Sequence, residues 1–105
     1  MEEEQEDLPN YQFMSLVYSL FQTAMMQLGK ISNPLTGKTE RNIVQAKATI
    51  DMLEMLKEKT KGNLYKTEEK MLLTNLSNLY LNYSDEVSKE PPAQPEKPEQ
   101  SEQKK

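Results

Sequence analysis

The chain has 105 residues, 35% of them hydrophobic, a length that allows one small domain. It contains neither cysteine nor histidine, which excludes disulfide bonds, thiolate and imidazole catalysis and the usual zinc sites. The net charge of −4 is unevenly placed, because residues 8–87 carry nine bases and eight acids and are therefore nearly neutral.

The two ends of the chain differ from its middle in composition. Residues 1–8 are mostly acidic, and residues 88–105 are rich in proline, glutamate, glutamine and lysine. Both segments have too few apolar side chains to offset the entropy of ordering, so they are predicted to be disordered around one helical domain at 9–87. The first residues of the chain are acidic, whereas a signal peptide begins with basic residues. Together with the lack of cysteine, this predicts a cytoplasmic protein.

A first helix is predicted over residues 10–28, with Pro9 and Asn10 at its entry and Gly29 at its exit. Its apolar side chains cover most of the helical circumference, and no charge occurs from Leu8 to Gly29. This pattern permits a core helix, an oligomer contact or a membrane span, although the recurring amides argue against the span. The residues predicted for self-association are Phe13, Leu16, Val17, Leu20, Phe21 and Met25.

The connection that follows contains a near match to a phosphate-binding loop. The motif G-x-x-x-x-G-K-[ST] is matched at Gly37, Lys38 and Thr39, but its first glycine is replaced by Ser32. Pro34 removes an amide donor, and a helix precedes the loop where a buried strand is required. The segment is therefore interpreted as a turn in which Thr39 is the N-cap of the next helix.

A second helix is predicted over residues 39–61, ending at Gly62. Its apolar residues, among them Val44, Ala48, Met52 and Met55, span a wider arc than one neighbouring helix would cover. Charged residues gather on a narrow strip, where Asp51 is expected to pair with Lys47 one turn earlier. The carboxylates of this strip alternate with lysines and are interpreted as a solvated face.

A third helix is predicted over residues 67–84, with Thr67 as N-cap and two glutamates on its first turn. Its apolar residues are predicted to form one buried stripe, made of Leu72, Leu73, Leu76, Leu79, Tyr80 and Tyr83. The asparagines at 75, 78 and 82 are predicted to face water. Helix three therefore needs one neighbour, whereas the first two helices each offer two apolar faces.

These patterns predict an all-α fold, a small three-helix antiparallel arrangement with apolar surface left over on the first two helices. A few hundred Å² of such surface, at about 25 cal/mol per Å², contributes several kcal/mol on self-association. We therefore expect a homo-oligomer, most simply a two-fold dimer through the first helix.

The segment from Ile50 to Leu64, IDMLEMLKEKTKGNL, followed by paired glutamates at 68–69 and leucines at 72–73, resembles the signature of a bacterial family, domain of unknown function 1844 (DUF1844). The resemblance covers about residues 11–83. It implies the fold but no activity, substrate or catalytic residue. Signature positions without a known role are Asp51, Glu58, Lys59, Thr60, Gly62 and Asn63.

No set of residues in the sequence predicts a catalytic, cofactor or metal site. The expected function is therefore protein binding by a self-associating, non-catalytic module with an unidentified protein partner. One alternative is an RNA- or ribosome-associated protein that uses the basic stretch Lys57–Lys70, although Tyr65 is its only aromatic residue. A second alternative is membrane association through the first helix.

Overall fold

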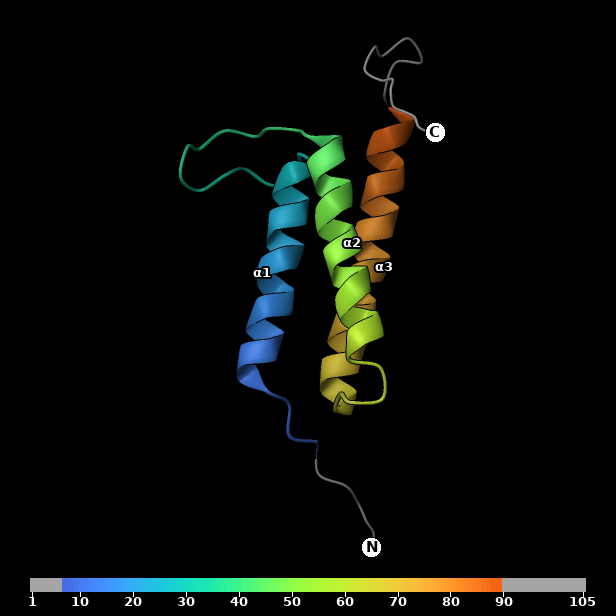
Figure 1. The fold of residues 1–105 in the computed structure, drawn as a ribbon. Coiled ribbons are helices and arrows are strands. Elements are labelled where there is room, and N and C mark those ends of the chain that lie inside the picture. The colour runs from blue at the N-terminus through green and yellow to red at the C-terminus, as the bar shows by residue number, and fades with distance from the viewer. Residues whose placement is uncertain (1–6, 90–105) are drawn as a thin grey trace, which may run out of the picture.

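The computed structural model describes residues 7–89, which form three helices and no strand. Helix α1 spans Tyr11–Gln27, α2 spans Ile43–Lys59 and α3 spans Lys66–Ser88. Each helix packs against the other two, and α2 runs antiparallel to α1 and α3 (Figure 1). The predicted all-α, three-helix antiparallel fold is confirmed, while the start of α2 and the end of α3 each differ by four residues from the prediction, since α3 continues to Ser88 instead of 84.

The predicted disordered ends lie mostly outside the described residues, which leave out 1–6 and 90–105. Four members of those segments are described, namely Asp7, Leu8, Ser88 and Lys89. The Asp7 carboxylate accepts a hydrogen bond from the Thr67 backbone N–H at 3.2 Å and a second from the Thr67 hydroxyl. Ser88 is the last residue of α3. Asp7 and Ser88 therefore belong to the helical domain.

The hydrophobic core lies between the three helices because each helix contributes one apolar stripe at helical spacing. Leu28, the C-cap residue of α1, completes the stripe of that helix. The buried core residues are Val17, Ala24, Leu28, Ala46, Ile50, Leu53, Leu72, Leu76 and Leu79.

The ends of α1 follow the predicted signals. The Asn10 side chain accepts a hydrogen bond from the Phe13 backbone N–H at 2.7 Å, as an N-cap residue does. At the other end, Gly29 has φ +79° and ends the helix in the left-handed conformation that glycine adopts without strain. A Cβ at this glycine would also stand 3.4 Å from Cβ of Arg41, so both backbone and packing favour glycine here.

Helix α2 begins at Ile43, four residues later than predicted, and its N-cap is Asn42 instead of Thr39. The Asn42 carboxamide oxygen accepts a hydrogen bond from the Gln45 backbone N–H at 3.0 Å. Both residue types are good N-caps, so local sequence did not distinguish them. Arg41, the residue before this cap, donates a hydrogen bond to the Glu86 carboxylate of α3 at 2.7 Å.

We expect Asn42→Ala to lower the free energy of unfolding by about 1 kcal/mol, because a backbone N–H of the first turn loses its acceptor. Thr39→Ala is the matched control, since Thr39 is exposed and lies outside α2. Urea denaturation followed by circular dichroism measures both values. Equal effects of the two substitutions would contradict this assignment of the cap.

Helix α3 begins at Lys66, and Thr67 is a helical residue instead of the predicted N-cap. The first turn is held by Glu68, which is buried. Its carboxylate accepts hydrogen bonds from the backbone N–H of Tyr65, at 2.8 Å, and from the backbone N–H of Asn10. One side chain thus satisfies donors at the N-termini of α1 and α3, where both helix dipoles favour a negative charge.

The prediction that α3 has one neighbour is wrong, and its predicted apolar stripe is confirmed only in part, at Leu72, Leu76, Leu79 and Tyr83. The helix packs on both α1 and α2, so its buried arc is rotated, and Leu73 and Tyr80 remain partly exposed. Asn78 faces water as predicted, whereas the Asn75 amide nitrogen is buried and has no hydrogen-bond partner within the described chain. Sequence periodicity located the apolar residues but not the direction of the second neighbour.

Candidate functional site

Helix α2 exposes a row of apolar side chains on the side away from the core. Val44, Ala48, Met52 and Met55 follow one another at intervals of three or four residues, which places them on one side of the helix. Their exposure is high for apolar residues, at 80% for Val44, 49% for Met52 and 47% for Met55. The second apolar arc predicted for this helix is therefore present and remains uncovered within the protomer.

Helix α1 adds Leu16 to the same surface. One side of α1 carries residues 16, 20, 23 and 27, as their spacing shows. Gln27, at the end of this series, accepts a hydrogen bond from the Thr49 hydroxyl of α2 at 2.6 Å. The series therefore runs along α2, and Leu16 within it is 47% exposed. We call the surface formed by Leu16, Val44, Ala48, Met52 and Met55 the α1–α2 face.

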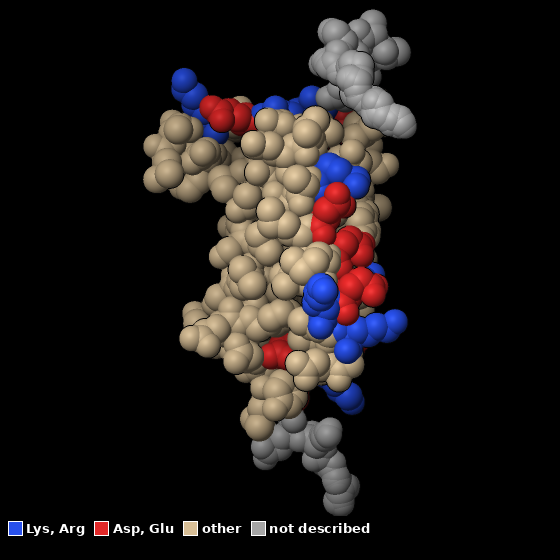
Figure 2. Space-filling view, in the orientation of Figure 1, with Lys and Arg blue, Asp and Glu red and all other residues tan. Residues whose placement is uncertain are grey.

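The α1–α2 face carries no charge. Figure 2 shows Lys, Arg, Asp and Glu gathered in one strip along α2 and at the two ends of the bundle, while the surface over α1 is tan. In the strip, Lys47 pairs with Asp51 at 3.0 Å and Lys57 with Glu54 at 3.5 Å. The predicted pairing of Asp51 is thus confirmed, and both partners of this pair are exposed to solvent.

The six residues predicted for self-association occupy three environments. Val17 is buried in the core of its own protomer, so it has no surface to offer a second chain. Leu16 is exposed, and the other members are partly buried and pack against the core: Phe13, Leu20, Phe21 and Met25. Self-association stays a prediction, and Leu16 is the member of this set whose side chain is most available for it.

Most of the family-signature positions lie at the turn between α2 and α3. Thr60 is the C-cap of α2, and its hydroxyl donates to the Leu56 carbonyl at 2.7 Å. Gly62 has φ +79°, which confirms the predicted left-handed turn, and the Asn63 backbone N–H donates to the Thr60 carbonyl at 2.8 Å. Glu58 and Lys59 are exposed. These residues end one helix and redirect the chain.

A cleft of about 410 Å³ opens beside this turn, with signature residues in its wall. Leu64, Leu72 and Leu73 form its apolar part, and its charged lining is balanced: Lys57 and Lys61 with Glu58 and Glu69. Sequence analysis singled out the signature and the lysine stretch but not the cleft, because Leu72 and Leu73 reach it only when α3 packs against α2.

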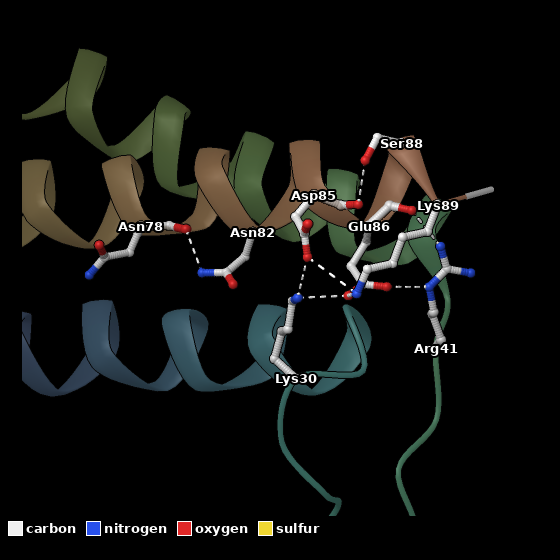
Figure 3. A network of polar contacts seen from close by, with 8 residues as sticks. All are labelled: Lys30, Arg41, Asn78, Asn82, Asp85, Glu86, Ser88 and Lys89. Carbon is white, nitrogen blue, oxygen red and sulfur yellow. Dashed lines mark hydrogen bonds and ion pairs between the residues drawn. The ribbon is translucent and has the colours of Figure 1, made fainter.

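The opposite end of the bundle holds a cluster of paired charges that sequence analysis missed (Figure 3). Glu86 of α3 is buried and accepts from Lys30 at 2.7 Å and from Arg41 at 2.7 Å, while Lys89 lies at 3.2 Å. These cations, Lys30 foremost, lower the pKa of Glu86 to about 2. Hydrogen bonds to Asp85 and then Glu86 raise the pKa of Lys30. The cluster joins the α1–α2 connection to α3 and is structural.

In the described part of the chain, no helix is both long and apolar enough to cross a membrane. Likewise, no group of three or more acidic side chains among residues 7–89 is arranged to hold a metal ion. Two surface features stand out among residues 7–89, the α1–α2 face and the cleft beside the α2–α3 turn.

Comparison with known proteins places the chain in a family without assigning an activity. The model of one family, described as domain of unknown function (DUF1844), matches residues 10–85. Neither curated proteins nor solved structures give a match. The matched residues include the whole of α1 and α2 and all of α3 except its last turn. The family resemblance seen in the sequence is thereby confirmed. The chain belongs to the DUF1844 family.

Proposed function

We propose that the protein is a cytoplasmic, non-catalytic interaction module that forms a homodimer through the α1–α2 face. The observation that carries this proposal is the row of exposed apolar side chains at Leu16, Val44, Met52 and Met55 on a surface without charge. Single exposed apolar residues are common on soluble proteins. A contiguous row of them marks an interaction surface.

A second copy of the same chain suits the α1–α2 face because this face is uncharged. In a two-fold contact each side chain near the axis meets its own copy, so a charged residue there would meet a like charge. The α1–α2 face avoids that repulsion, and its methionines adapt their shape to an opposing apolar surface. An 80-residue domain also has a small core, and association adds the burial that such a core lacks.

The test is the molar mass in solution, measured by light scattering without detergent on the full chain. We expect about twice the 12.2 kDa of one chain for the wild type. Leu16→Glu and Met52→Glu each place a charge near its own copy and should weaken association at least about tenfold. Both side chains are about half exposed, so the substitutions leave the core in place.

Thr74→Glu is the matched control, because Thr74 is exposed on α3 and the change adds the same charge. Its mass should equal that of the wild type. Phe21→Glu would be a poor probe, since Phe21 packs against the core and the variant would lose stability as well. A wild type that stays at 12.2 kDa at high protein concentration would contradict the proposal.

A further inference from the structure

The row of apolar side chains on α2 is followed by a charged residue. After Val44, Ala48, Met52 and Met55, the next position at the same spacing is Lys59, the last residue of the helix. Lys59 is exposed, and it forms no ion pair with any residue from 7 to 89. When a second copy covers the row, this lysine lies at the edge of the contact. An acid of the other chain is favourable there and a like charge is unfavourable.

The other end of the α1–α2 face is a polar hollow of about 400 Å³, at the end of the bundle opposite the α2–α3 turn (Figure 1). It lies between the C-terminal end of α1 and the N-terminal end of α2. Thr23 and Gln27 in its wall belong to the side of α1 that runs along α2, and Gln45 lies three residues before Ala48 on α2. The polar hollow is therefore continuous with the α1–α2 face.

The wall of the polar hollow contains an acid that has no cation beside it. Glu40 is exposed and forms no ion pair within residues 7–89. Arg41, the cation of the wall, already donates to Glu86 through Nε and Nη2, each at 2.7 Å. Met26 and four amide side chains complete the wall: Gln27, Asn33, Asn42 and Gln45. A carboxylate, amide oxygens and a thioether together suit a lysine, whose ammonium group donates to oxygen while its carbon chain packs on methionine.

Two-fold symmetry allows two orientations of a second copy on the α1–α2 face. With the α2 helices parallel, each residue of the row lies near its own copy, so Lys59 meets Lys59 and Glu40 meets Glu40. With the helices antiparallel about the middle of the row, Val44 lies opposite Met55. Four residues further out on each side, Glu40 then lies opposite Lys59. Opposite charges meet only in the antiparallel orientation, and they do so twice because of the symmetry.

We propose that the two chains associate with their α2 helices antiparallel, and that Lys59 of each chain enters the polar hollow of the other and pairs with Glu40. This inference rests on the homodimer of the proposed function and adds the orientation of the chains to it. The polar hollow is incomplete in one protomer, because the cation for its acid comes from the second copy. The apolar row supplies the burial, and the two ion pairs select the orientation.

Disulfide cross-linking tests the orientation, since the chain contains no cysteine of its own. Val44→Cys and Met55→Cys are prepared as separate full-length proteins, mixed under reducing conditions and then oxidised, and mass spectrometry identifies the linked products. We expect position 44 to be joined to position 55. In an antiparallel pair, two copies of position 44 are separated by about 16 Å of helix, which a disulfide cannot span. Linkage of each protein with itself would overturn the inference, because it requires parallel helices.

Charge reversal tests the pairing of Lys59 with Glu40. Glu40→Lys and Lys59→Glu should each weaken association about fivefold, because two attractions become repulsions. The variant that carries both substitutions should regain the affinity of the wild type. Lys70→Glu is the matched control, since Lys70 is exposed on α3, outside the α1–α2 face, and its affinity should be unchanged. Failure of the double variant to recover would overturn the pairing.

The molar mass distinguishes failure of this inference from failure of the proposed function. A wild-type dimer in which position 44 links only to itself keeps the α1–α2 face as the contact and excludes the antiparallel orientation. A wild-type dimer that links at neither position contradicts both, because the row is then not in the contact. A wild type that stays at 12.2 kDa contradicts both as well.

Discussion

Leu53→Ala should destabilise the domain by about 3 kcal/mol, the largest effect we expect from a single substitution. Leu53 is fully buried in the middle of α2, the helix that packs on both of its neighbours. Removing its side chain forfeits apolar burial and leaves a cavity between three helices that cannot all move to fill it. For a domain of this size the loss is comparable with the whole stability, so the variant should be partly unfolded at room temperature.

Met52→Ala is the matched control for this prediction, because Met52 is the preceding residue of the same helix and is about half exposed. We expect a change below about 1 kcal/mol, since less surface is buried and no cavity forms. Urea denaturation monitored at 222 nm gives both values, with the midpoint and slope compared at low protein concentration so that association does not contribute. Similar losses for the two variants would mean that the core is not where the structure places it.

Glu86→Gln should lower the free energy of unfolding by about 2 kcal/mol or more at neutral pH. The substitution keeps the shape of the side chain but leaves Lys30 and Arg41 without the carboxylate that both contact at 2.7 Å. Asp85→Asn is the control, because Asp85 also pairs with Lys30 but is about half exposed to solvent. Its loss should be clearly smaller, and a larger loss than that of Glu86→Gln would contradict the central role of Glu86 in the cluster.

The ion pairs of Glu86 also make the free energy of unfolding depend on pH in the acid range. The pKa of Glu86 is lowered from 4.5 to about 2 by Lys30 and Arg41, so the folded protein holds the ionised form more strongly than the unfolded chain does. Its contribution is complete above pH 4.5 and is lost as pH falls toward 2. Thermal unfolding across this range should therefore show wild type and Glu86→Gln converging as pH falls. Parallel curves would show that Glu86 does not titrate with a lowered pKa.

The sequence signals that proved reliable act within one helical turn. Asn10 and Gly29 mark the ends of α1 as predicted, and Gly62 ends the segment after α2 in the left-handed conformation. The pairing of Lys47 with Asp51 is likewise a contact between residues one turn apart. Each of these features requires only the chemistry of neighbouring residues, which is why the sequence was sufficient to predict them.

The exposed apolar surfaces were only partly predictable from the sequence. The excess apolar arc of α2 was predicted, and Met52 and Met55 are exposed accordingly. On α1 the same reasoning did not separate Val17, which is buried in the core, from Leu16, which faces solvent next to it. A helix that is apolar on most of its circumference gives no periodic signal for which side its own chain covers.

The sequence therefore determines that three helices form and roughly where they end, because helical periodicity, caps and glycines operate over a few residues. It does not determine which residue among several good caps starts α2, or that Glu68 and Glu86 are buried. Those outcomes depend on contacts such as Asn10 with Glu68 and Lys30 with Asp85, 58 and 55 residues apart in the chain. A helical wheel specifies directions around one axis, whereas burial and the cleft at the α2–α3 turn arise from the way three axes are packed together.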